Sequence, residues 1–72
     1  MQTIIKEYQI QVNDSSIKRY DNFELAKKVW SNVEQFVQSR GGNATFKIRD
    51  AVFNEFSKLI KIETHVYCEI ES

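Results

Sequence analysis

The stretch of sequence that decides the fold is DNFELAKKVWSNVEQFVQSRGG, which runs from Asp21 to Gly42. Its apolar residues recur at the three- and four-residue spacing that brings side chains to one face of a helix. That stripe consists of Ala26, Val29, Trp30, Val33 and Val37, with Leu25 and Phe36 on its flank. The opposite face carries charges of both signs, which favours packing on a protein core over lying on a membrane surface.

Boundary signals at both ends of this stretch support the helix. Asp21 followed three residues later by Glu24 is typical of a capping box at a helix N-terminus. Gly41 follows Arg40 at the point where a left-handed residue commonly ends a helix. The sequence therefore predicts a helix over residues 22–39.

The residues before the helix predict a hairpin. Residues 3–12 alternate between apolar and polar as a half-buried strand does, with Ile4, Tyr8 and Ile10 on one face. Residues 13–16, Asn-Asp-Ser-Ser, indicate a turn, because these side chains hydrogen-bond the nearby backbone. Residues 16–20 then return as a short second strand.

The residues after the helix predict a second hairpin, with strands over residues 44–53 and 59–70. The register that puts Ile48 on the same face as Ile62 requires an odd-length loop, which the five residues 54–58 provide. An alternative interpretation makes residues 50–60 a second helix with Asp50 as its N-cap, because short apolar runs discriminate poorly between helix and strand.

We therefore expect one small α+β domain over residues 1–72, with element order β-β-α-β-β. Its sheet is four-stranded and mostly antiparallel, and one helix packs on one of its faces. The crossover through the helix lets the third strand pair beside the first, which predicts strand order 2-1-3-4 or 2-1-4-3.

Composition excludes several classes of function. Ten Lys and Arg balance ten Asp and Glu, so bulk electrostatic attraction to nucleic acid or to a membrane surface is not expected. The N-terminal residues lack the basic and apolar regions of a signal peptide, and the longest apolar runs are too short to span a bilayer. We expect a cytoplasmic protein. Residue types with A/T-rich codons outnumber those with G/C-rich codons, which fits a bacteriophage or another mobile element.

The residues that carry chemistry are few and scattered. Cys68 is the single cysteine and His65 the single histidine, which do not make a disulfide or a closed zinc site. Three residues apart on a strand, they are expected on opposite faces, which argues against a Cys–His nucleophile. The sequence predicts no metal, no cofactor and no enzyme.

The sheet face away from the helix is the expected binding surface. Strand parity predicts that aromatic and basic side chains gather there, and the candidate partner-binding residues are Arg49, Phe53, Lys61, His65 and Tyr67. The leading hypothesis is a small non-enzymatic module that blocks a host protein, as a phage or mobile-element inhibitor or adaptor.

Two further modes of binding follow from the same strands. The long strand over residues 59–70 predicts an exposed edge, which gives a second route to a partner and a route to a homodimer. The alternative function is weak binding of single-stranded nucleic acid through Lys47, Arg49, Lys61, His65 and Tyr67.

Overall fold

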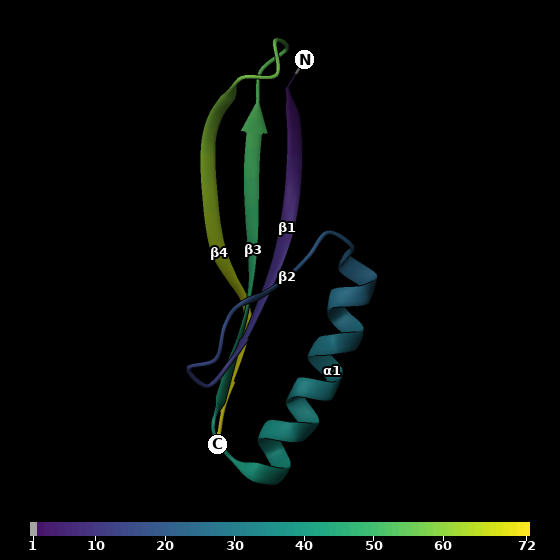
Figure 1. The fold of residues 1–72 in the computed structure, drawn as a ribbon, viewed down its shortest axis with the longest axis vertical. Helices are drawn as coiled ribbons and strands as arrows, with labels where there is room; N and C mark the ends of the chain where they lie inside the picture. Colours follow the sequence, from purple (N-terminus) through teal and green to yellow (C-terminus); the bar gives the residue numbers. More distant parts are fainter. Residues whose placement is uncertain (1) are drawn as a thin grey trace.

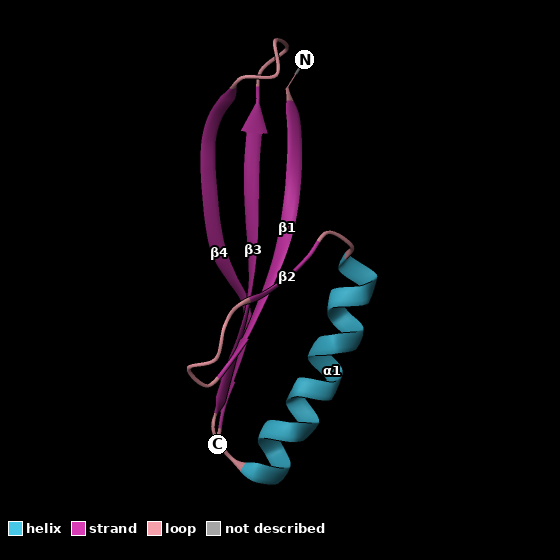
Figure 2. Cartoon of the chain, in the orientation of Figure 1, coloured by secondary structure: helices cyan, strands magenta, loops and turns pink. Residues whose placement is uncertain are grey.

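The computed structural model describes residues 2–72 and contains one helix and four strands (Figure 1). The elements are β1 (Thr3–Val12), β2 (Lys18–Tyr20), α1 (Phe23–Arg40), β3 (Asn43–Phe53) and β4 (Leu59–Glu71). The strands form one antiparallel sheet in the order β2-β1-β3-β4, and α1 packs on one face of it (Figure 2). The β-β-α-β-β fold is confirmed, with the first of the two expected strand orders.

The helix begins one residue later than predicted, because Asn22 caps it in place of Asp21. Asn22 has extended backbone angles, and its Oδ1 accepts a hydrogen bond from the N–H of Leu25 at 3.0 Å. Glu24 pairs instead with Lys27 one turn further along, with 3.3 Å between the charged atoms. The predicted capping box is therefore wrong, although the helix itself is confirmed.

The end of the helix is set by two glycines and by the turn that follows β1. Gly41 has a φ of 82°, and its N–H donates to the carbonyl of Val37 at 2.7 Å. At Gly42, with a φ of 112°, an added Cβ would collide with Oδ1 of Asn13. That oxygen accepts from the N–H of Asn43 at 3.0 Å and so ties the start of β3 to the end of β1.

The core lies between α1 and the helix-facing side of β1 and β3. Its largest fully buried side chains are Phe46, Ile10 and Val37. Trp30 meets Phe46 edge to face with 5.7 Å between ring centroids, a favourable geometry for aromatic pairs. The predicted apolar stripe of the helix is confirmed, since its members are buried or partly buried and its flanking residues stay exposed.

The helix covers only one half of the sheet. In Figure 1, β1, β3 and β4 continue well past the end of α1 where Phe23 lies, and the whole molecule measures 47 × 20 × 17 Å. We call the uncovered half the arm; it consists of residues 3–7, 49–53 and 59–65 with the loop 54–58. We call the two sheet faces the helix side and the open face.

The hairpin at the end of the arm has the expected five-residue loop. Oδ1 of Asn54 accepts from the N–H groups of Phe56 at 2.9 Å and Lys58 at 3.0 Å, which closes the loop. The alternative helix over residues 50–60 is wrong. Asp50 does not cap a helix but lies within β3, opposite Lys6 of β1.

The register between β3 and β4 differs from the prediction because β4 contains two extra residues. Neither Tyr67 nor Ile60 has a partner in β3, so each forms a bulge. A bulge moves the following side chains to the other face of a sheet. The predicted even-sum register therefore holds only at the ends of the hairpin, and between the bulges residues 61–66 are shifted by one.

The close approach of Gly42 to Asn13 gives a test of this fold. Gly42→Ala adds a Cβ where the backbone is left-handed and the space is occupied, so we expect the free energy of unfolding to fall by about 1–3 kcal/mol. Urea denaturation measures the change. In an Asn13→Ala background the same substitution should cost less, because the collision is removed. Equal stability of Gly42→Ala and the unsubstituted protein would contradict the described turn.

Candidate protein-binding surface

The five residues expected to form one patch lie on two faces of the sheet. Arg49 and Phe53 lie on the open face, as predicted. Lys61 pairs with Val52 and His65 with Ile48, both of which are core residues of the helix side. Because directly paired residues share a face, the open-face placement predicted for Lys61 and His65 is wrong. The cause is the pair of bulges in β4.

Tyr67 also lies on the helix side, at the bulge itself. Its ring stands 5.2 Å from that of Phe46 and 5.7 Å from that of Phe23, with interplanar angles of 59° and 82°. The side chain is 48% exposed, so it forms the border between the core and solvent. Its predicted placement on the open face is therefore wrong as well. Phe23, which the sequence analysis did not single out, joins this aromatic cluster as the first residue of α1.

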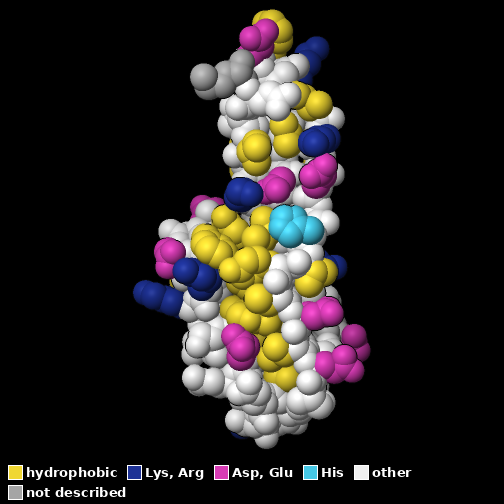
Figure 3. Space-filling view, turned by 180° about the vertical axis from the view of Figure 1, so that it is seen from behind, with side chains coloured by type: hydrophobic (Ala, Val, Ile, Leu, Met, Phe, Trp, Pro, Cys, Tyr) yellow, Lys and Arg dark blue, Asp and Glu magenta, His cyan; other side chains and the backbone are white. Residues whose placement is uncertain are grey.

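Above the aromatic cluster, the helix side of the arm carries a row of paired charges. Lys6 Nζ lies 2.9 Å from Asp50 Oδ1, and Lys61 Nζ lies 3.1 Å from Glu63 Oε1. The hydrogen bond to Asp50 raises the pKa of Lys6. Figure 3 shows basic and acidic side chains above the seam between α1 and the sheet, where hydrophobic side chains gather. The two carboxylates are thus neutralised by neighbours of this chain.

The open face of the arm carries an apolar patch, of which only Phe53 was among the predicted binding residues. Ile5, Ala51 and Ile62 form one cross-strand row, and Phe53 and Leu59 lie in the next row. We call these five residues the tip patch. The three longest aliphatic side chains among them, Ile5, Leu59 and Ile62, are exposed. Ile62 was expected on the other face, and only the bulge at Tyr67 brings it here.

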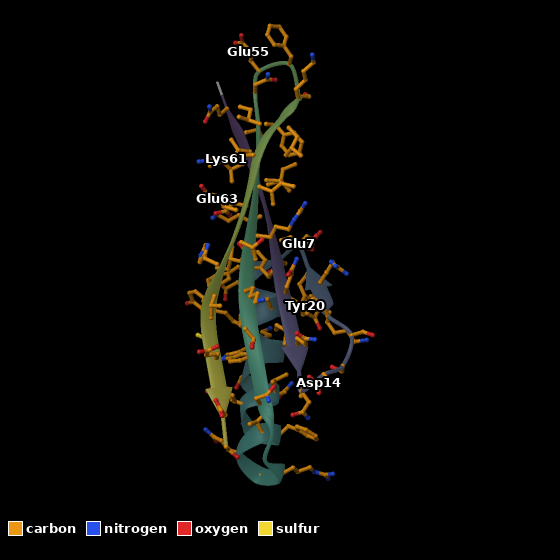
Figure 4. All side chains as sticks on the ribbon, turned by 90° about the vertical axis from the view of Figure 1, so that its left-hand side faces the viewer. Glu7, Asp14, Tyr20, Glu55, Lys61 and Glu63 are labelled. Atoms are coloured by element: carbon orange, nitrogen blue, oxygen red, sulfur yellow. The ribbon has the colours of Figure 1, made fainter. Side chains whose placement is uncertain are left out.

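Polar side chains border the tip patch at the end nearer to the half of the sheet that α1 covers. Glu7 lies opposite Arg49 in the sheet and makes an ion pair with Arg19 of β2, 3.3 Å between Nε and Oε1. It also accepts a hydrogen bond from Gln9 at 2.8 Å. Figure 4 shows Glu7 on the opposite side of the sheet from Lys61 and Glu63. An apolar centre with a polar border is typical of a surface that binds another protein.

A groove adjoins the tip patch at the outer edge of β1. β2 pairs only with residues 8–10 of β1, so residues 3–7 have no strand beside them on that edge. The groove has a volume of about 500 Å³. Its lining comes from β1, β2 and the start of α1, and consists of Ile5, Lys6, Glu7, Arg19, Tyr20, Asp21 and Leu25. Ile5 belongs to both the groove and the tip patch, so the two surfaces are continuous.

Cys68 and His65, the only cysteine and histidine of the sequence, do not belong to the tip patch or the groove. Cys68 pairs with Phe46 and packs against the core, whereas His65 is exposed. Both lie on the helix side, so the expectation that they project to opposite faces is wrong, again because of the bulge at Tyr67. Within residues 2–72 no three His, Cys, Asp or Glu side chains come close enough together to hold a metal ion.

Comparison of the chain with models of protein families, with characterised proteins and with solved structures finds no match. Over the described residues, α1 is not apolar enough to cross a membrane.

The position of Tyr67 predicts a role in stability. Tyr67→Ala removes a half-exposed ring that packs on Phe23 and Phe46, and we expect the free energy of unfolding to fall by about 2 kcal/mol. Thermal or urea denaturation checks this. Tyr67→Phe keeps the ring and serves as the control, with stability close to that of the unsubstituted protein. A Tyr67→Ala protein of unchanged stability would show that the ring does not pack as described.

Proposed function

We propose that this chain is a small non-enzymatic protein-binding module that binds its partner through the arm. The observation that carries the proposal is the exposure of Ile4 and Ile5, which are neighbours on opposite faces of β1 and are both 56% exposed. The edge strand β1 is therefore exposed on both faces of the arm, whereas Ala51 and Val52 of the central strand β3 are buried. Exposed aliphatic side chains on both faces of a projecting sheet are a liability in a free protein, and a bound partner would remove them from water.

The groove beside β1 supports a specific mode of binding. Residues 3–7 present unpaired main-chain groups along an edge that β2 leaves free. An extended segment of the partner would pair with this edge in line with β2, and its apolar side chains would contact Ile5 and Leu25. Main-chain hydrogen bonds would supply affinity, and the mixed charges around the groove would select the partner's sequence.

A module of this size would act by covering its partner, which is how an inhibitor or an adaptor works. The A/T-rich codon usage implied by the sequence suggests a phage or mobile-element origin and a host protein as the partner. A cytoplasmic location belongs to the same proposal. Its support is the free thiol of Cys68, which suits a reducing compartment.

The nucleic-acid alternative has less support. Lys47 and Arg49 lie on the open face, whereas Lys61, His65 and Tyr67 lie on the helix side, so they do not form one track for a phosphate backbone. Glu7 lies directly opposite Arg49 and would repel phosphate.

The proposal is tested by capturing the partner from a host lysate with the tagged protein and two of its variants. Ile5→Lys places a charge where the tip patch and the groove meet, and we expect it to reduce partner capture at least tenfold, because an unpaired charge would be buried in the complex. Ile5 is exposed, so the fold should survive, which circular dichroism checks. Mass spectrometry identifies and quantifies the captured protein.

Gln11→Lys is the matched control, because Gln11 lies on the same strand and the same face but in the half that α1 covers. It should capture the partner as the unsubstituted protein does. Equal capture by Ile5→Lys would exclude the tip patch and the groove. Capture that is lost after nuclease treatment would favour the nucleic-acid alternative.

A further inference from the structure

The outer edge of β4 is a second surface, separate from the groove beside β1. β4 is the last strand of the sheet, so no strand pairs with this edge among residues 2–72. Figure 4 looks along the sheet onto this edge, which runs the length of the molecule with neither helix nor loop across it. α1 packs mainly on β1 and β3. The main-chain groups of β4 that face outward are therefore free to pair with another strand.

The bulges limit which part of this edge can pair regularly. Between Ile60 and Tyr67 lies one uninterrupted run, residues 61–66. Two copies of β4 that pair antiparallel about a twofold axis place each residue opposite one on the same face. The twofold axis then passes through a residue pair. The largest number of residues from the run 61–66 pair across the axis when that residue is Glu63 or Thr64.

Charge distinguishes these two registers. With the axis at Glu63, two glutamates face each other, which is unfavourable. With the axis at Thr64, Glu63 faces His65 of the second copy twice on the helix side, where the carboxylate can accept a hydrogen bond from the imidazole. On the open face the exposed Ile62 then meets the exposed Val66 of the second copy, also twice. These hydrogen bonds, the aliphatic pairs and the paired threonines all favour this register.

We propose that the chain forms a homodimer in which two β4 strands pair antiparallel about Thr64. The two sheets join into one sheet of twice the width, with both helices on the same side and the two arms pointing in opposite directions. The groove beside β1 remains free in each copy, so the dimer does not depend on the function proposed above. A register centred on Ile62 would pair Lys61 with Glu63, but the bulge at Ile60 interrupts it after one residue on either side.

Cysteine pairing tests the register. In a Cys68→Ser background, Thr64→Cys places two thiols opposite each other across the axis, at the spacing of directly paired residues. We expect mild oxidation to link most of this protein into a covalent dimer, seen on a non-reducing gel. Ile62→Cys and Val66→Cys should each stay largely unlinked alone and should link to each other when the two are mixed.

The native assembly is measured in parallel by sedimentation of the unsubstituted protein, for which we expect twice the 8.5 kDa mass of one chain. Glu63→Lys should weaken the dimer roughly tenfold, and the exchanged pair Glu63→Lys with His65→Glu should restore it. A mass that stays at 8.5 kDa over the whole concentration series would overturn the proposal. Stronger linking through Ile62→Cys than through Thr64→Cys would also overturn it.

Discussion

The structure depends on a mismatch of length between one helix and the strands beneath it. A helix rises about 1.5 Å per residue, so the 18 residues of α1 span about 27 Å. A strand rises about 3.3 Å per residue, and the 13 residues of β4 span about 43 Å. One helix of this length cannot cover such a hairpin. The described chain therefore contains a packed half, centred on Phe46, and a projecting half that α1 does not cover.

The uncovered half shows how edge strands are kept from uncontrolled pairing. Charged side chains are placed at the edge, as Lys61 and Glu63 are here, and bulges interrupt the regular ladder. In this chain the bulges at Ile60 and Tyr67 also leave one regular run between them, residues 61–66, which limits pairing of this edge to that run. The net charge is zero, and each face of the sheet carries charges of both signs, with the apolar tip patch on the open face.

The elements of the fold were predictable because each is encoded by a local pattern. The stripe around Trp30 identified the helix, and the alternation of apolar and polar residues identified β1, with an interruption at Lys6, and β4. The face of each β4 residue was not predictable, because the alternation from Ile60 to Ile70 continues unbroken in the sequence across the bulge at Tyr67. Residues 59–65 of β4 are exposed on both faces of the sheet, so burial does not determine which face each of these side chains takes. The bulge instead accompanies the packing of Tyr67 on Phe23 and Phe46, which are distant in sequence.

Nuclear Overhauser contacts between side chains test most directly whether α1 covers one half of the sheet and leaves the arm uncovered. We expect contacts from Phe23 to Tyr8 and Phe46 and from Trp30 to Phe46 in the packed half. We expect none from any residue of α1 to Ile4 or Val52, which lie on the same face of the sheet but in the arm. Contacts between α1 and either of these two residues would show that the helix reaches over the arm and would contradict the account.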